Sequence, residues 1–281
     1  MRSRAWSTLF ISLALAACGG SAAEPEPEPT TAGAEAEPPP PPPPPPPARI
    51  RAIHATSEPA VSSVSFAFAE GADPLITNLA YRTATAYLEV PPGAHHVRLL
   101  GVPSVETGEA PELLATDTEL ASESNTTLLL VGVAAGDPPL AVVVAPDRTE
   151  PPGEGLAALR LYHAIAGQGP VDVCVAGAAP RDPALPVFTA VEPNGFARGD
   201  AGEWADVLPS GEIALQLRAP NPTPCRGRVL GVARFTPTAG SLHTLVAIGR
   251  ASGRPRVDRE LVVCNDPPGD GACTVVPIAA R

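Results

Sequence analysis

The stretch Ala-Arg-Ile-Arg-Ala-Ile-His-Ala at residues 48–55 recurs as Ala-Ala-Leu-Arg-Leu-Tyr-His-Ala at residues 157–164, so that arginine, histidine and alanine return at one constant spacing. Two later pairs of segments match in the same order along the chain: residues 127–132 with 244–249, and residues 144–147 with 263–266. Collinear self-similarity of this kind is the signature of a duplicated structural unit. We therefore predict two copies, over residues 48–150 and 156–281.

Each copy contains short apolar runs separated by proline, glycine, asparagine and aspartate, which is the pattern of strands joined by turns. In the first copy this pattern predicts seven strands, at residues 50–55, 64–68, 84–90, 95–100, 113–120, 128–133 and 140–144. Seven short strands with a turn roughly every 8 to 12 residues are typical of an immunoglobulin-like sandwich. The expected fold is all-β: two tandem immunoglobulin-like antiparallel β-sandwiches after a disordered proline-rich stalk.

The composition supports folded domains rather than a disordered chain. Apolar residues make up 44% of the 281 residues and charged residues only 17%, so most of the chain after the stalk can bury a core. Residues 151–155, Pro-Pro-Gly-Glu-Gly, suit a short linker between two domains. The alternative is one large all-β domain in which the copies are two halves.

The amino terminus has the pattern of an export signal. Arg2 and Arg4 precede a short apolar stretch, residues 5–17, which ends in Leu-Ala-Ala directly before Cys18. This ending resembles the lipobox of bacterial lipoproteins, which implies cleavage before Cys18 and attachment of lipid to its thiol. Residues 1–17 are thus the expected signal peptide. An ordinary secretory peptide and an uncleaved membrane helix are the alternatives.

The lipid would attach the protein to a membrane of the bacterial envelope, since several acyl chains together hold a protein firmly. Gly19 follows Cys18, so the aspartate type of inner-membrane retention signal is missing. We therefore expect the outer membrane of a two-membrane bacterium, with the body facing either the periplasm or the exterior.

Residues 18–47 form the expected stalk. They contain five acidic residues and end in ten consecutive prolines, residues 38–47. A segment of this composition has almost nothing to bury and cannot form a backbone ladder, so it stays extended. The proline tract alone would reach roughly 31 Å as a polyproline II helix. A spacer is the favoured interpretation, and a docking site for a proline-binding partner is the alternative.

The body resembles the family called domain of unknown function 4397, which occurs in secreted and lipid-anchored bacterial proteins. The first copy carries the family motif residues Ala48, Arg51, His54, Ala55, Pro59, Ala60, Val61, Val64, Asn78 to Tyr81, Tyr87, Val90, Pro91, Pro92 and Gly93. The second copy carries Arg160, His163, Ala164, Pro170, Val171, Asp172, Val173 and Val175, and departs in residues 187–204. The resemblance implies a fold and a compartment, and it implies no activity.

Four cysteines remain once Cys18 is lipidated, and all lie in the second copy. An exported chain is expected to oxidise them, and three pairings are possible. We predict Cys264 with Cys273, which closes a small loop, and Cys174 with Cys225. A zinc site is disfavoured because the chain has no Cys-x-x-Cys pair.

His54 and His163 occupy the same position in the two copies, next to Arg51 and Arg160. A histidine and an arginine could form an anion or metal site. Residues three apart on a strand point to opposite faces, however, so each pair does not converge. A buried histidine bonded to backbone is the favoured interpretation.

No catalytic motif is present: the chain has no Gly-x-Ser-x-Gly, no phosphate-binding loop and no His-Glu-x-x-His. Acidic pairs such as Glu109 with Glu112, or Asp200 with Glu203, lie in expected loops, where carboxylates are usually solvated. We therefore expect no enzyme, no catalytic residue, no metal and no cofactor.

Charge differs between the copies. The first has 13 acidic residues against five arginines, whereas the second, counted together with the linker, has 12 of each. Arg250, Arg254, Arg256 and Arg259 lie close together in the sequence and could contact an anionic polysaccharide or lipid headgroup. The favoured interpretation is a solvated face neutralised by nearby acids. Nucleic acid is not expected as a partner of so acidic a chain.

The leading hypothesis is a non-catalytic envelope lipoprotein that serves binding, adhesion or envelope structure, with an envelope polysaccharide or another envelope protein as partner. The second hypothesis is a carbohydrate-active or other hydrolase with its site between the two copies. A cleft in which His, Asp or Glu side chains from both copies converge would favour the hydrolase.

Overall fold

The computed structural model describes residues 42–280, apart from gaps at residues 59–60, 135, 137, 178, 180–181, 199–201, 210 and 252–257. The expected signal peptide, the lipidation site Cys18 and the stalk up to residue 41 lie outside the described residues. The described residues of the compact unit Pro44–Arg281 form strands and turns, and no α-helix is found among them. Accordingly, none of them belongs to a helix with the length and apolar character needed to cross a bilayer.

The first copy folds into two four-stranded sheets around one core. Its strands are β1 (Ala48–His54), β2 (Ser63–Ala67), β3 (Ile76–Ala80), β4 (Leu88–Val90), β5 (Gly93–Leu100), β6 (Glu112–Leu120), β7 (Asn125–Val131) and β8 (Ala141–Pro146). One sheet has the order β4-β1-β7-β8 and the other the order β3-β2-β5-β6. Ile50 from the first sheet and Phe66 and Leu99 from the second are fully buried in the core between them.

The second copy repeats this arrangement and adds a strand. Its strands are β9 (Ala157–His163), β10 (Val171–Val175), β11 (Leu185–Val191), β12 (Trp204–Val207), β13 (Ile213–Arg218), β14 (Val229–Phe235), β15 (Leu242–Ile248), β16 (Glu260–Asp266) and β17 (Cys273–Pro277). The sheets have the orders β12-β9-β15-β16-β17 and β11-β10-β13-β14. Strands β9 to β16 therefore take the places of β1 to β8, and β17 has no counterpart in the first copy.

The all-β sandwich class predicted from the sequence is confirmed. Within each copy one pair of neighbouring strands is parallel: β1 with β7, where His54 lies opposite Leu130, and β9 with β15, where His163 lies opposite Ala247. The other ladders between these strands are antiparallel. Because the parallel pairs recur at equivalent positions, the duplication extends to the register of the strands.

Two strand predictions for the first copy differ from the structure. The strand expected at residues 84–90 is only β4, because the hydroxyl of Thr85, rather than a backbone oxygen, accepts the hydrogen bond from the Ala52 amide at 3.0 Å. Strand β3 was not predicted. Asn78 interrupts its alternation by adopting a left-handed backbone conformation, with φ of 52°, and the pairing with β2 shifts register nearby.

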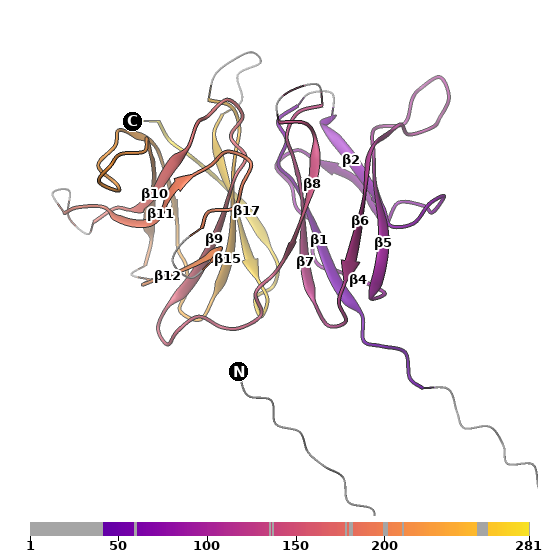
Figure 1. Ribbon diagram of the computed structural model, residues 1–281, viewed down its shortest axis with the longest axis horizontal. Helices are drawn as coiled ribbons and strands as arrows, with labels where there is room; N and C mark the ends of the chain where they lie inside the picture. The colour runs from indigo at the N-terminus through magenta and orange to yellow at the C-terminus, as the bar shows by residue number, and fades with distance from the viewer. Residues whose placement is uncertain are drawn as a thin grey trace, which may run out of the picture. The chain divides into compact units, whose positions relative to one another are not determined.

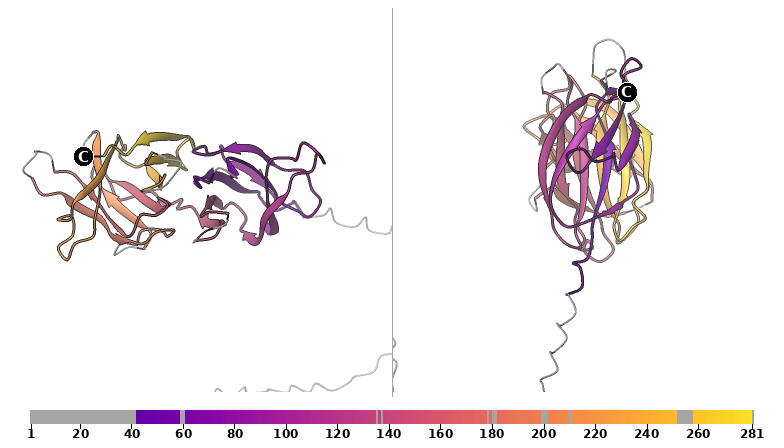
Figure 2. Two further views of the ribbon diagram at one scale, coloured as in Figure 1. Left: turned by 90° about the horizontal axis from the view of Figure 1, so that it is seen from above. Right: turned by 90° about the vertical axis from the view of Figure 1, so that its right-hand side faces the viewer.

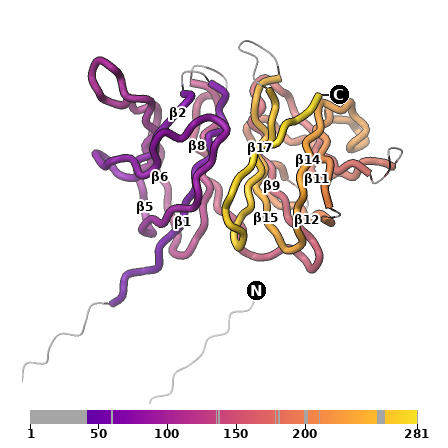
Figure 3. Tube along the Cα trace, turned by 180° about the vertical axis from the view of Figure 1, so that it is seen from behind, coloured from indigo at the N-terminus to yellow at the C-terminus, as the bar shows by residue number. Residues whose placement is uncertain are grey.

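A third apolar cluster lies between the copies, at a contact that we call the seam. Its buried residues are Ile53, Ala55, Leu129, Val131, Tyr162, Val246, Ile248, Val262 and Cys264. Figure 1 shows the sheets that supply them side by side, with β1, β7 and β8 next to β9, β15 and β17, and the left view of Figure 2 and Figure 3 also show the two copies next to each other.

Candidate functional site

Two buried ion pairs cross the seam in opposite directions. Arg51 of β1 pairs with Asp266 at the end of β16, and Arg160 of β9 pairs with Asp147, the residue after β8. All four side chains have no exposed surface. Each copy thus gives an arginine to the other copy and receives one from it. The arrangement is that of an isologous contact, in which the same patch is used on both sides.

A threonine completes each half of this network, which we call the crossed ion pairs. Arg51 Nε donates to Thr127 Oγ1 at 2.9 Å, and the Thr127 hydroxyl donates to the Asp147 carboxylate at 2.8 Å. In the other half, Arg160 Nη2 donates to Thr244 Oγ1 at 2.8 Å, and the Thr244 hydroxyl donates to Asp266 at 2.6 Å. Each buried carboxylate therefore accepts hydrogen bonds from both copies, which offsets the cost of its burial.

Aromatic rings cover the arginines. The guanidinium carbon of Arg51 lies 5.0 Å from the centre of the Tyr87 ring, and that of Arg160 lies 4.9 Å from Trp204 and 5.0 Å from Phe196. These distances are those of cation–π contacts. Burial is the largest single influence on the pKa of Arg51 and lowers it, but the raising influences of Asp266, Tyr87 and Asp147 together outweigh burial, so the pKa is raised.

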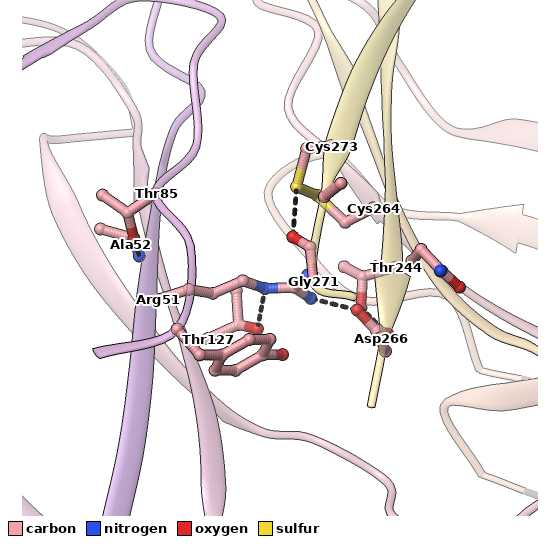
Figure 4. The surroundings of a disulfide bond; sticks show 12 residues. Arg51, Ala52, Thr85, Thr127, Thr244, Cys264, Asp266, Gly271 and Cys273 are labelled. Carbon is pink, nitrogen blue, oxygen red and sulfur yellow. Dashed lines mark hydrogen bonds and ion pairs between the residues drawn. A yellow bond between two sulfur atoms is a disulfide. The ribbon is translucent and has the colours of Figure 1, made fainter. Parts of the chain in front are cut away.

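The Cys264–Cys273 disulfide supports one half of the network. The two cysteines lie opposite each other in the β16–β17 ladder, and the bond closes the hairpin that carries Asp266. Figure 4 shows the disulfide beside Asp266, with Arg51 reaching towards it from the first copy. The second disulfide, Cys174–Cys225, joins β10 to the connection between β13 and β14. The structure contains both pairings that the sequence predicted.

The paired histidines lie on the opposite face of their strands from the arginines. His54 Nε2 donates to the Val61 carbonyl at 2.6 Å, and His163 Nε2 donates to the Gly169 carbonyl at 3.2 Å. Burial lowers the pKa of both rings. These contacts are those of structural histidines bonded to backbone. Across the part of the chain that the structure describes, no group of three or more His, Cys, Asp or Glu side chains could hold a metal ion.

The predicted arginine cluster is only partly described. Arg254 and Arg256 lie outside the described residues. Arg250 reaches across the seam, where its Nε donates to Ser57 Oγ at 3.2 Å and its Nη2 lies 3.6 Å from the Glu58 carboxylate. Arg250 is therefore engaged with the first copy.

The remaining predicted charges are spread over the surface. Arg259 directly precedes β16, and its carbonyl accepts a hydrogen bond from the Ile278 amide at 2.9 Å. Glu112 pairs with Arg98 at 2.7 Å, and Asp200 lies outside the described residues. Glu203 lines a cleft at the seam.

Two clefts open along one flank of the seam. The first has a volume of about 410 Å³ and lies between Thr56, Val133 and Pro138 of the first copy and a wall formed by residues 164–168 of the second. The second has a volume of about 390 Å³ and lies beside Val143 of the first copy. Asn194 lines both clefts.

The two clefts differ in their lining. Among the described residues that line the first, none is ionisable. The second is lined by Glu192, Glu203 and Arg198, together with the rings of Phe196 and Tyr162. A ligand that occupied both would therefore meet a neutral hydrogen-bonding surface and then a charged one.

Sequence reasoning missed the crossed ion pairs. It recognised Arg51 and Arg160, but it weighed each arginine only against the histidine of its own strand. The aligned segments contain a signal that could have found the partners, since Asp147 recurs as Asp266 at the end of the repeat and Thr127 recurs as Thr244. Polar residues kept in both copies of an otherwise apolar strand indicate a shared contact.

The comparison with known families agrees with the resemblance drawn from the motifs. Residues 48–174 match the family described as Domain of unknown function (DUF4397). The match covers the first copy and continues into β10 of the second. No curated protein matches the chain.

Proposed function

We propose, from the lipobox-like residues before Cys18 and from the match of residues 48–174 to a domain family of unknown function, that the chain is a non-catalytic lipoprotein of the bacterial envelope. Its lipid is attached at Cys18, and residues 18–47 hold the body away from the membrane. The body serves as a binding or structural module, with an envelope polysaccharide as partner or, as the second choice, another envelope protein. Nucleic acid is not a partner, because the first copy is strongly acidic.

The observation that carries this proposal is the packed seam. An interdomain active site needs water and reacting groups between the domains, but here the middle of the seam is filled by an apolar cluster and the crossed ion pairs. The two copies are thus packed together within one compact unit, which suits a module that presents a fixed surface.

The path of the chain supports a surface turned away from the membrane. The stalk enters β1 at Ala48, and the first cleft begins at Thr56, beyond the far end of the same strand. The seven residues of this strand are separated by six steps of about 3.3 Å, so its two ends lie roughly 20 Å apart. Loops from both copies meet at the far end, where a partner could reach them.

Attachment is tested with the full chain and a Cys18→Ala variant, expressed with a clickable palmitate analogue in a two-membrane bacterium. The wild type should be labelled and fractionate with the outer membrane, and the variant should be unlabelled. An unlabelled, soluble wild type would contradict the anchor.

Binding is tested by sedimentation of the detergent-solubilised full chain with insoluble envelope polysaccharide, with protease-treated and glycosidase-treated envelopes as controls. We expect the protein to sediment with protease-treated envelopes but not with glycosidase-treated envelopes. The reverse pattern would identify a protein partner, and retention by neither would contradict a binding role.

The second candidate is a glycoside hydrolase, and one observation favours it: Glu192 and Glu203 line the same cleft between the copies. Two carboxylates across a sugar linkage are what glycoside hydrolysis needs. Reducing ends released from envelope polysaccharide by the wild type, and lost in a Glu203→Gln variant, would establish the hydrolase and overturn the non-catalytic proposal. We expect no release from either protein.

A further inference from the structure

The two flanks of the seam are equivalent by the duplication, and their backbone hydrogen bonds show it. The Arg82 amide donates to the His54 carbonyl at 3.0 Å, and the Asn194 amide donates to the His163 carbonyl at 2.6 Å. Both Arg82 and Asn194 adopt a left-handed conformation, with φ of 70° and 58°. Arg82 and Asn194 are therefore the same position in the two copies.

The residues across the seam are equivalent as well. Glu260 lies opposite Ile248 at the start of β16, and Ala141 lies opposite Val131 at the start of β8. Gly249 and Gly132 follow these two partners, and both have positive φ. Arg250 and Val133, the next residues, are thus also counterparts.

One flank is closed by large side chains. Both carboxylate oxygens of Glu260 accept from Arg82 Nη1, at 2.7 and 2.8 Å. Tyr81 packs beside this pair against the seam cluster. Arg250 lies at the edge of this flank and donates to Ser57, which itself lines the first cleft. These contacts bridge the two copies along this flank.

The other flank has small residues at the matching positions and is open. Asn194 stands in place of Arg82, Ala141 in place of Glu260 and Val133 in place of Arg250. The two clefts, of about 410 and 390 Å³, lie on this flank and share Asn194 as part of their walls. The copies have thus diverged at the positions that decide whether the flank is filled.

We propose that this open flank is a binding groove for a neutral oligosaccharide, a proposal that rests on the envelope function above and names its ligand class. Sugar hydroxyls both donate and accept hydrogen bonds, and the carboxamides of Asn194 and Gln168 can do the same. Val133 and Pro138 supply apolar surface beside them.

The second cleft adds the groups that bind a further sugar unit. Glu192 and Glu203 offer acceptors to sugar hydroxyls, and Phe196 offers a ring against which the apolar face of a sugar can stack. Two adjoining clefts with a shared wall suit a chain of several units better than a compact ligand. The cleft has two carboxylates against one arginine, Arg198, and this negative balance disfavours an acidic polysaccharide because like charges repel.

The test introduces the ion pair of the closed flank at the equivalent positions of the open flank. The double variant Asn194→Arg with Ala141→Glu recreates the Arg82–Glu260 pair at the equivalent positions, and it leaves the net charge unchanged. Titration of the full chain in detergent with chitohexaose and cellohexaose, followed by calorimetry, should show binding of at least one of them by the wild type. Binding should weaken at least tenfold in the double variant.

The matched control is Arg82→Asn with Glu260→Ala, which removes the equivalent pair from the closed flank. It should bind the hexasaccharide as the wild type does. A Gln168→Ala variant removes one carboxamide without filling the groove, and it should weaken binding severalfold even if the double variant folds poorly.

Three results would overturn the groove: binding of neither hexasaccharide by the wild type, unchanged binding in a folded double variant, or preference for a heparin hexasaccharide or an extended peptide. Such results would not change the outcome of the palmitate-labelling experiment or of the sedimentation experiment with envelope material. A failure of the ligand class is therefore distinguishable from a failure of the envelope function.

Discussion

The two copies share a polar network and differ in how they support it. In the first copy Asp147 follows an edge strand, and Tyr87 donates to its carboxylate at 2.7 Å. In the second copy Asp266 belongs to a hairpin closed by the Cys264–Cys273 disulfide, which has no counterpart in the first. The duplication thus kept the groups that face the partner copy and changed the means of holding them. A residue of the crossed ion pairs must fit partners in both copies, whereas a residue that only holds an aspartate in place must fit its own copy alone.

The largest effect is expected on separating the copies. Residues 44–150 contain Arg51, Thr127 and Asp147, which is one full set of the network. Alone, this fragment would expose the apolar seam face, so we expect it to fold only as a dimer that pairs Arg51 of one chain with Asp147 of the other. Light scattering with circular dichroism tests this. A folded monomer at micromolar concentration would support independent sandwiches, and an unfolded fragment would show one shared core.

The second-largest effect is expected on the free energy of unfolding when one partner of a crossed ion pair is removed. Asp266→Ala leaves Arg51 buried without its carboxylate, and such a loss costs about 3 to 5 kcal/mol. Urea unfolding of the full chain measures it. The exposed pair of Arg98 and Glu112 provides the control, because Glu112→Ala should cost less than about 1 kcal/mol. Equal effects of the two substitutions would contradict the importance of the seam.

The two disulfides should contribute different amounts to the stability of the fold. The Cys174–Cys225 bond closes 51 residues and the Cys264–Cys273 bond closes nine. Chain entropy then predicts losses of about 4 and about 2.5 kcal/mol on replacing each pair by alanine. If the shorter bridge also holds Asp266 in place, its removal and Asp266→Ala should be non-additive. Additive losses in a double-mutant cycle would show that the disulfide does not act through the crossed ion pairs.

The smallest effect concerns the paired histidines. Burial lowers the pKa of His54 and of His163 in the folded state below the ordinary value of 6.5. The unfolded chain therefore binds more protons below that pH, so stability should fall as the pH drops from about 7 to 5. Unfolding midpoints across this range should depend less on pH in a His54→Gln, His163→Gln variant. An unchanged dependence would exclude both rings as its source.

Much of the fold was predictable from local pattern. The repeat, the all-β class and the oxidation of the four cysteines followed from self-similarity, apolar alternation, turn residues and cysteine count, whereas the disulfide pairing was one choice among three. Strand β3 escaped because Asn78 breaks its alternation, and the strand expected at 84–90 was too long because a side chain replaces a backbone acceptor. Both errors arise from single hydrogen bonds or dihedral angles that periodicity does not encode.

The candidate site was decided by tertiary structure. The sequence by itself determined that Arg51 and Arg160 recur, and that their histidines lie on the other face. Only the packing of the copies placed each arginine on the carboxylate of the other copy. Likewise, Asn194 and Ala141 are ordinary in the sequence. Their small size matters only because the duplication sets them opposite each other, where Arg82 and Glu260 fill the equivalent flank.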